Sequence, residues 1–216
     1  MSIAEICPQR VMPVLVLTAA DASAALRAAF QRGGLHCAEV TLRTPAAERS
    51  IAELARDPSF VVGAGTVLRP EQVHRVAELG ARFVVSPGLS LAVAETCRQL
   101  GLAYFPGVAT PTEIQTALAC GLHELKFFPA EVLGGAPALK ALAAPFADVS
   151  FMPTGGLNED NAAAYLALPA VAAVGGSWIA TDLLVATGDF AEITRRSASA
   201  VALTALAPAS VGSGAR

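Results

Sequence analysis

A parallel α/β fold, and within it a (β/α)8 barrel, is the fold class that the sequence predicts. Short apolar runs alternate along the chain with alanine- and leucine-rich stretches, and eight such runs are spaced roughly 20 to 25 residues apart. The runs are continuously apolar, which is typical of parallel strands buried on both faces of a sheet. The alternative is an open doubly wound sheet, which is disfavoured because no GxGxxG motif follows the first run.

The predicted strands share short runs of β-branched and other apolar residues. They are 11–17, 37–42, 60–65, 83–88, 103–108, 124–129, 150–155 and 172–177. Since no linker separates them, we expect a single domain over residues 1–216, with about residues 205–216 as a flexible tail.

Capping signals place helices between these strands. Thr44-Pro45 and Pro70 each mark a helix start, and Thr110 and Glu113 flank a proline as the two partners of a capping box. Asn158 is expected to cap the seventh helix. Several helices are expected to end at glycines, namely Gly33-Gly34, Gly80, Gly101 and Gly121.

The composition argues against several classes of protein. A net charge of −3 without a basic stripe argues against a nucleic-acid partner. The four cysteines and three histidines lack ligand spacing, so we expect reduced cytosolic thiols, no metal and no cofactor. Residues 162–180 carry no charge, but Pro169 breaks the stretch, so a membrane span is disfavoured. The run 11–17 resembles an export signal, but Pro13 interrupts it and a strand is favoured, which predicts a cytoplasmic protein.

Lys126 stands out because nearly all the basic residues of the chain are arginines. Of the 15 basic residues, only Lys126 and Lys140 are lysines. Lys140 lies in a helix-like stretch, whereas Lys126 lies in an apolar strand beside Phe127 and Phe128, which are expected to desolvate it. A desolvated lysine can lose its proton and attack a carbonyl group, which arginine cannot do. The alternative is a buried stem with its ammonium group in water at a rim.

Other polar residues gather where the predicted strands end, the usual place for a barrel's catalytic groups. Glu39, Thr41 and Arg43 alternate along the second strand and so share one face, as do Lys126 and Phe128 on the sixth. Glu39 suits a general acid/base directed at Lys126, or else a simple ion-pair partner for Arg43, and Arg43 suits a substrate carboxylate.

Glycine-rich motifs end the last two predicted strands. Pro153-Thr154-Gly155-Gly156 and Gly175-Gly176-Ser177 let backbone N–H groups approach an anion, which indicates a phosphate site. The alternative is that these glycines only make tight turns.

Taken together, the motifs closely resemble the 2-keto-3-deoxy-6-phosphogluconate (KDPG) and 4-hydroxy-2-oxoglutarate aldolase family. The matching strings cover almost the whole chain in order: EVTLRT (39–44), GAGTVL (63–68), SPGL (86–89), KFFPAE (126–131), PTGG (153–156) and GGSW (175–178). The segment before the first strand looks short for a family that often places a helix there, which leaves closure of the barrel bottom open.

The resemblance implies a class I aldolase, a homotrimer without metal or cofactor, that cleaves KDPG to pyruvate and glyceraldehyde 3-phosphate. Lys126 would form the Schiff base, with Glu39 as its general acid/base. Arg43, helped by Thr66, would hold the pyruvate carboxylate. The other residues implied to bind substrate are Pro87, Phe128, Thr154, which would touch the hydroxyl groups, and Gly155, Gly156, Gly176 and Ser177, which would receive the phosphate.

Three alternatives stay open. A sister family cleaves the galactose-configured substrate, but its members match KFFPAE and GGSW less well. A phosphosugar epimerase or a noncatalytic phosphosugar-binding barrel would share the fold, although neither needs a lysine between apolar residues.

Overall fold

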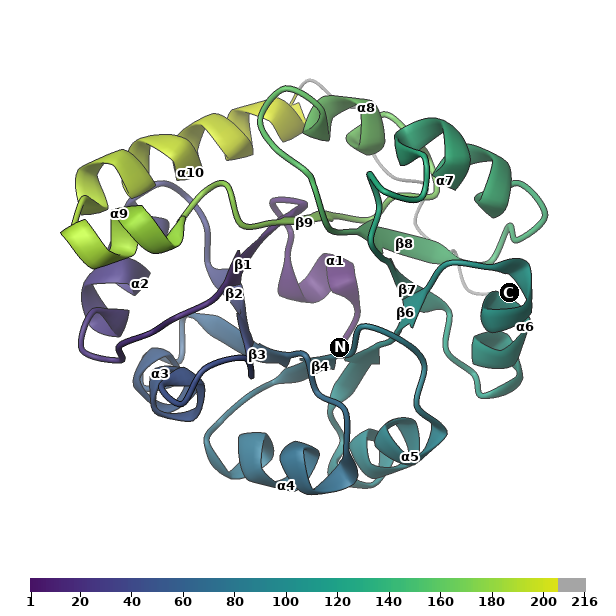
Figure 1. The fold of residues 1–216 in the computed structure, drawn as a ribbon, viewed down its shortest axis with the longest axis horizontal. Helices are drawn as coiled ribbons and strands as arrows, with labels where there is room; N and C mark the ends of the chain where they lie inside the picture. Colours follow the sequence, from purple (N-terminus) through teal and green to yellow (C-terminus); the bar gives the residue numbers. More distant parts are fainter. Residues whose placement is uncertain (206–216) are drawn as a thin grey trace.

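The strands form a ring that is surrounded by helices in a computed structural model, which describes residues 1–205 (Figure 1). The predicted tail lies outside the described residues, apart from Ala205 at its start. The strands are β1 (Val11–Leu15), β2 (Cys37–Thr41), β3 (Val61–Gly65), β4 (Phe83–Val85), β5 (Ala103–Phe105), β6 (Gly107–Val108), β7 (Glu124–Phe127), β8 (Ser150–Pro153) and β9 (Val174–Gly176). The helices are α1 (Ile3–Ile6), α2 (Ser23–Arg32), α3 (Ala47–Leu54), α4 (Pro70–Glu78), α5 (Leu91–Leu100), α6 (Pro111–Ala119), α7 (Gly135–Ala143), α8 (Ala162–Leu166), α9 (Asp182–Thr187) and α10 (Phe190–Ala205).

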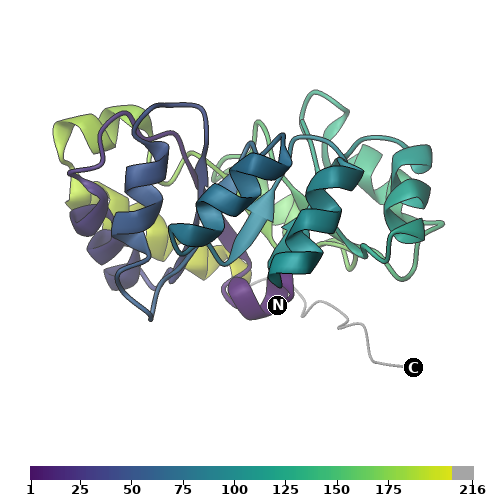
Figure 2. The ribbon, with the colours of Figure 1, turned by 90° about the horizontal axis from the view of Figure 1, so that it is seen from below.

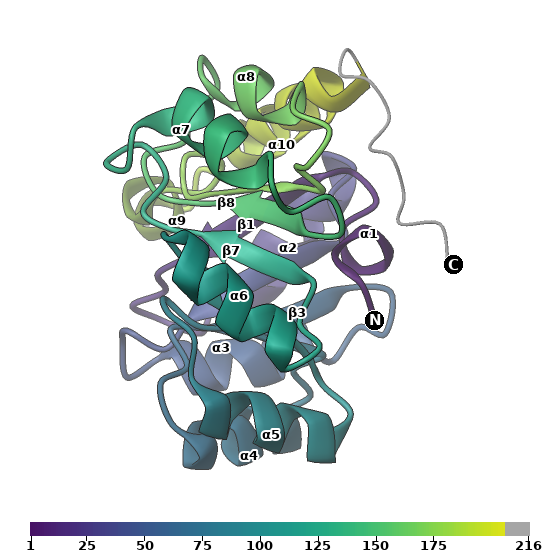
Figure 3. The same ribbon diagram turned by 90° about the vertical axis from the view of Figure 1, so that its right-hand side faces the viewer.

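All strand pairs are parallel, which confirms the α/β class, but the strands form two sheets instead of the single closed sheet that was predicted. The larger sheet has the order β5-β4-β3-β2-β1-β9 and the smaller has the order β6-β7-β8. Pro106 divides the predicted strand 103–108 into β5 and β6, because proline has no N–H to continue a ladder. At the other junction, isolated bridges join Phe151 to Val171 and Thr154 to Gly175. Helices α5, α6 and α7 follow one another along the outside of the ring on the side of β7 (Figure 3).

Most strands are shorter than predicted at their carboxyl ends. The predicted strand 83–88 ends at Val85, and the predicted strand 124–129 ends at Phe127. The remaining residues, which include Pro87 and Phe128, form the loops on which the candidate site is built.

Two apolar cores lie on opposite sides of the strands. The outer core lies between strands and helices, and includes Val40, Leu125 and Phe127. The inner core fills the lower part of the ring; its buried members are Ile3, Ile6, Cys7, Met12, Cys37, Phe83, Val85, Phe105, Met152 and Ala173.

Helix α1 closes the bottom of the ring, which the short N-terminal segment had left open (Figure 2). Its Ile3 and Ile6 are buried in the inner core, and Ser2 and Glu5 form a capping box at its start. The main-chain N–H of Ile3 donates to the Glu124 carboxylate on β7 at 2.9 and 3.1 Å. A helix of four residues therefore suffices to plug the bottom of the ring, because packing in the inner core and the Glu124 carboxylate hold it in place.

The capping predictions were confirmed at Pro70 and at the Thr110–Glu113 capping box, and were wrong at two other helices. Helix α3 begins only at Ala47, because the Thr44 hydroxyl donates to the Leu17 carbonyl instead of capping a helix. Helix α8 begins only at Ala162, because the Asn158 side chain accepts from main-chain N–H groups in the preceding turn. No helix among residues 1–205 has the length and apolar character to cross a membrane.

Candidate active site

A buried ion pair between Lys126 and Glu39 lies inside the ring, above the inner core. Lys126 Nζ lies 3.3 Å from Glu39 Oε1, although the two residues belong to strands of different sheets, β7 and β2. Lys126 is 5% exposed and Glu39 is fully buried. The snorkelling alternative for Lys126 is therefore wrong, because the ammonium group is directed at a buried carboxylate and not at bulk water.

Strand alternation directs both side chains inward. On β7, Leu125 and Phe127 belong to the outer core, so Lys126 between them faces the ring interior. Lys126 Nζ lies 5.1 Å from the centroid of the Phe128 ring, within the range of a cation–π contact. The expectation that Phe127 also desolvates Lys126 was wrong, because Phe127 lies on the opposite face of the strand.

The strand β3 makes room for the Glu39 carboxylate. A Cβ atom on Gly65 would lie 2.1 Å from Glu39 Oε1, so only glycine fits there beside the carboxylate. Glu39 Oε2 is buried and has no hydrogen-bond partner among the described residues. A buried oxygen without a partner is costly, so this atom is the natural place for a water molecule or a substrate hydroxyl group.

A cavity of about 160 Å³ brings together most of the predicted substrate-binding residues. Of those residues, it is lined by Arg43, Phe128, Thr154, Gly155, Gly156, Gly176 and Ser177. Sequence reasoning missed three further lining residues, Val14, Val16 and Leu157. Val14 and Val16 have the same parity as the inward-facing Met12 along the first strand, a signal that could have identified them.

Arg43 is the charged residue of this cavity lining. Its side chain is exposed, and among the described residues Glu39 pairs with Lys126 and forms no ion pair with Arg43. The alternative in which Glu39 simply neutralises Arg43 is therefore wrong. The arginine can offer its planar donors to a carboxylate that enters the cavity.

The glycines at the ends of the last two strands are required by the local backbone or by close neighbours, in addition to their place in the cavity lining. Gly155 and Gly156 have φ values of 99° and 83°, which L-residues rarely adopt. A Cβ atom on Gly176 would lie 1.7 Å from the Trp178 ring, and one on Gly175 would lie 2.4 Å from Thr154 Oγ1. The tight-turn interpretation is thus correct for the first pair, and it is compatible with main-chain N–H groups that face a ligand.

Thr66 and Pro87 are not among the residues that line this cavity. Thr66 has a φ of 59°, an unfavourable left-handed conformation for a β-branched residue. The neighbouring Val67 fixes this loop, since its N–H donates to the Val85 carbonyl at 3.2 Å and its carbonyl accepts from the Ser86 hydroxyl at 2.5 Å. Pro87 is exposed in the loop after β4, which these two hydrogen bonds join to the loop after β3.

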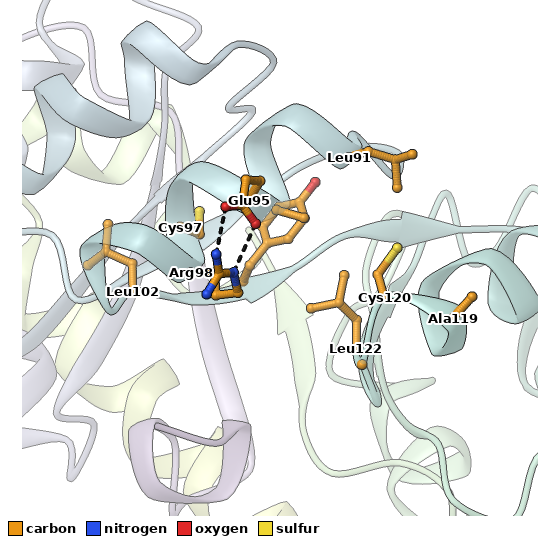
Figure 4. A pocket seen from close by; sticks show the side chains of 11 residues that line it. Leu91, Glu95, Cys97, Arg98, Leu102, Ala119, Cys120 and Leu122 are labelled. Atoms are coloured by element: carbon orange, nitrogen blue, oxygen red, sulfur yellow. Dashed lines mark hydrogen bonds and ion pairs between the residues drawn. The ribbon is translucent and has the colours of Figure 1, made fainter.

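A larger cavity, of about 590 Å³, lies outside the ring between α5 and the end of α6 (Figure 4). Its lining includes Leu91, Tyr104 and Cys120, together with Glu95 and Arg98, which form a salt bridge on the α5 side. None of the predicted site residues lines it, so its size does not make it the active site. Among residues 1–205, no group of three or more His, Cys, Asp or Glu side chains is placed to hold a metal ion.

A buried lysine–carboxylate pair inside a ring of parallel strands, with a cavity nearby that is lined by an arginine and by glycines of two strand ends, suits a lyase that works through an amine. The family model described as KDPG and KHG aldolase matches residues 3–196. The chain belongs to this family of aldolases, in which KHG denotes 4-hydroxy-2-oxoglutarate.

Individual relatives agree with this assignment. A 2-dehydro-3-deoxy-phosphogluconate aldolase of Treponema pallidum is 44% identical over 186 residues, which cover 86% of this chain and 89% of the relative. A KDPG aldolase from Legionella pneumophila, with pyruvate captured at low pH as a covalent carbinolamine intermediate, has a TM-score of 0.86 and 40% identity, over 88% of this chain and 93% of its own. The KDPG aldolase of Zymomonas mobilis ZM4 with 3-phosphoglycerate has a TM-score of 0.88 and 39% identity, over 96% of this chain and 97% of its own.

Proposed function

We propose that the protein cleaves KDPG to pyruvate and glyceraldehyde 3-phosphate through a Schiff base on Lys126. The observation that carries this proposal is the buried contact of 3.3 Å between Lys126 Nζ and Glu39 Oε1. An amine that is removed from water and placed beside one carboxylate can pass a proton to it and attack a carbonyl carbon. Cleavage of 4-hydroxy-2-oxoglutarate by the same chemistry is a second activity that membership of the family supports.

The reaction begins when neutral Lys126 Nζ adds to the C2 ketone of KDPG. Glu39, which carries the proton that it took from Lys126, protonates the developing oxyanion and then takes a proton from the positively charged nitrogen, which gives the neutral carbinolamine. It returns this proton to the hydroxyl group, which leaves as water. In the resulting iminium ion, Glu39 removes the proton of the C4 hydroxyl group. The C3–C4 electron pair moves into the iminium system, which releases glyceraldehyde 3-phosphate and leaves an enamine.

The enamine is then protonated at C3, and water adds to the iminium carbon to release pyruvate and regenerate the lysine. Every proton in this scheme passes through one carboxylate, which matches Glu39, the single buried acid among residues 1–205. The partnerless Glu39 Oε2 is the atom that would act through a water molecule. The Legionella relative supports the first step, because a carbinolamine is the product of an amine and a ketone.

The cavity residues would hold the two ends of the substrate. We assign the carboxylate to Arg43, helped by Thr66, and the hydroxyl groups to Thr154. The phosphate would lie against the main-chain N–H groups of Gly155, Gly156 and Gly176 and the hydroxyl of Ser177, while Phe128 forms a wall of the cavity. Pro87 and Thr66 lie outside this lining and would contact the substrate from the neighbouring loops. The Zymomonas relative supports a site for a phosphorylated three-carbon product, because 3-phosphoglycerate differs from glyceraldehyde 3-phosphate only in having a carboxylate in place of the aldehyde.

At the level of architecture, we propose that the two sheets act as one (β/α)8 barrel in a single domain of residues 1–216. The bridges from Phe151 to Val171 and from Thr154 to Gly175 support closure between β8 and β9. At the other junction, Lys126 N–H donates to the Pro106 carbonyl at 2.8 Å. A homotrimer in the cytoplasm is a further prediction, and light scattering on the purified protein tests its assembly state.

The galactose-configured substrate is the main alternative, and the comparison of kcat/KM for the two epimers tests it directly. An epimerase or a noncatalytic barrel would release no pyruvate from KDPG. The decisive test of the proposal is therefore pyruvate release by the wild type, by Lys126→Arg and by the matched control Lys140→Arg.

We expect Lys126→Arg to lose at least about 1,000-fold in kcat, because the charge is retained and the nucleophile is lost. Lys140→Arg should retain wild-type turnover, since Lys140 is exposed on α7. Pyruvate release by Lys126→Arg at a rate near that of the wild type would refute the Schiff-base role.

A further inference from the structure

The turn at Gly155 and Gly156 is supported from behind by Glu131, a residue that the proposed reaction does not use. Glu131 lies in the loop that follows Lys126, and its main-chain N–H donates to the Gly155 carbonyl at 3.1 Å. The preceding residue, Ala130, donates in the same way to the Thr154 carbonyl at 2.9 Å. The loop that leaves the catalytic strand is therefore joined to the glycine turn by two main-chain hydrogen bonds.

The stem of the Glu131 side chain packs directly on the turn. A Cβ atom on Gly156 would lie 2.7 Å from both Cβ and Cγ of Glu131. Because Gly156 has a left-handed φ of 83° and no side chain, its position depends on what packs against it. Truncation of the Glu131 stem would remove these packing contacts from the turn and leave the main-chain hydrogen bonds in place.

The Glu131 carboxylate is held by a residue outside the turn. The hydroxyl group of Tyr165, on α8, donates to Glu131 Oε1, and Tyr165 is only 1% exposed. Burial and then this hydrogen bond raise the pKa of Tyr165 above its ordinary value, so the phenol stays a donor. Glu131 and Tyr165 line a separate cavity of about 430 Å³, so the negative charge lies behind the turn and not among the residues that line the smaller cavity.

A second contact holds the turn from Asn161, the residue that precedes α8. Asn161 Nδ2 donates to the Gly156 carbonyl at 3.2 Å, and Asn161 Oδ1 accepts from the Asn158 N–H at 2.8 Å. Tyr165 and Asn161 thus connect one short helix to both sides of the glycine turn. With the carbonyls occupied by these contacts, the turn has its N–H groups available for an anion.

We propose that Glu131, held by Tyr165, is a positioning residue that sets the Gly155–Gly156 turn for the substrate phosphate. This inference rests on the proposed function and deepens its phosphate site. Glu131 touches no reacting atom, and it acts through the turn. The consequence is specific: loss of the Glu131–Tyr165 contact should weaken the preference for a phosphorylated substrate and leave the chemistry at Lys126 intact.

The test compares kcat/KM for KDPG with kcat/KM for 2-keto-3-deoxygluconate, which lacks only the phosphate. In Glu131→Ala we expect the ratio to fall by at least about tenfold, the factor for one lost hydrogen bond to a charged group, through KM for KDPG. Tyr165→Phe should shift the ratio in the same direction, because it removes only the donor. Glu131→Gln should keep the wild-type ratio, since its amide oxygen can still accept from Tyr165.

Tyr104→Phe is the matched control, because Tyr104 is the other tyrosine of the chain and its hydroxyl group holds a different loop, at the Ser90 N–H. It should leave the ratio unchanged. Thermal unfolding of each variant checks the fold, and Tyr165→Phe carries the test if Glu131→Ala does not fold.

Two failures can be told apart. A wild type without preference for KDPG over 2-keto-3-deoxygluconate overturns the phosphate assignment and this inference with it. A wild type that prefers KDPG, combined with Glu131→Ala and Tyr165→Phe variants that keep the preference or lose activity equally on both substrates, overturns the positioning role alone.

Discussion

The carboxylate of Glu39 occupies the space that a side chain at Gly65 would fill. An added Cβ atom would lie 2.1 Å from Glu39 Oε1, the same oxygen that lies 3.3 Å from Lys126 Nζ. Gly65 has no left-handed φ and pairs with Thr41 in a regular ladder, so the glycine is required by its neighbour and not by its backbone. The geometry of the lysine–glutamate pair is therefore set in part from a third strand.

Gly65→Ala should push the Glu39 carboxylate away from Lys126 without breaking the sheet. A misplacement of about 1 Å can cost about 100-fold in rate, so we expect a loss of that order in kcat with little change in KM. Steady-state pyruvate release measures it. Gly88→Ala is the matched control, because a Cβ atom there would meet nothing within 4 Å. Equal kcat values for Gly65→Ala and the wild type would show that Glu39 does not need this position.

Ser177→Asp should impair the binding of phosphorylated substrate by charge repulsion. Ser177 lines the cavity beside Gly155, Gly156 and Gly176, where the phosphate is proposed to lie. Two like charges at contact distance near a surface repel strongly, so KM for KDPG should rise at least about tenfold. Ser177→Asn, with nearly the same shape and no charge, should have a much smaller effect. If KM for 2-keto-3-deoxygluconate rises as much as KM for KDPG, the phosphate lies elsewhere.

Strand alternation explains which parts of the site could be predicted from sequence. The parity that places Glu39 and Lys126 inward is readable in the chain, because apolar neighbours on either side belong to the outer core. The same parity rules out Phe127 as a neighbour of Lys126 and identifies Val14 and Val16, and both of these inferences were missed. Contacts between distant segments, such as Gly65 with Glu39 or Glu131 with Tyr165, leave no periodic signal and require the structure.

Some residues with a clear local preference have a different role in the structure, which the sequence alone could not show. Thr44 and Asn158 are good capping residues, but both side chains bond to other main-chain groups and their helices start later. Pro106 is an ordinary apolar residue in a strand pattern, and yet its missing N–H divides the ladder. Capping succeeded at Thr110, where the proline and Glu113 reinforce the same helix start.

Ile6→Ala tests the role of α1 as the plug of the ring. Ile6 is 2% exposed in the inner core, so truncation should lower the free energy of unfolding by about 2–5 kcal/mol. Chemical denaturation measures it. Leu91→Ala, at a residue that is 56% exposed, should change stability by less than about 0.5 kcal/mol. A similar small effect for both variants would mean that α1 does not contribute to the core.

Glu124→Gln tests the carboxylate that holds α1, through the pH dependence of stability. Burial raises the pKa of Glu124 above 4.5, and the Ile3 N–H and the N-terminal amine only partly oppose this shift while Glu5 adds to it. The folded state therefore binds the proton more tightly than the unfolded state, so this carboxylate lowers stability as the pH rises from 4.5 through its folded pKa. The free energy of unfolding of the wild type, measured relative to Glu124→Gln, should fall in that window.

Glu95→Gln provides the opposite case for the same measurement. Hydrogen bonds from Arg98 and Gln99 lower the pKa of Glu95 to about 2, so its contribution is present above pH 4.5 and is lost as the pH falls towards 2. Above pH 4.5, the difference in the free energy of unfolding between Glu95→Gln and the wild type should not change with pH. In the same range, the difference between Glu124→Gln and the wild type should change. A flat profile for Glu124→Gln would contradict the burial argument.

The most direct test of the Schiff-base mechanism is borohydride reduction of the protein in the presence of pyruvate, followed by intact mass and peptide mapping. The chain has two lysines, so Lys140 serves as an internal control for Lys126. The proposed mechanism predicts one pyruvate-dependent adduct, on Lys126, that disappears in Lys126→Arg. A folded protein that releases pyruvate from KDPG and yet carries no adduct on Lys126 would contradict it.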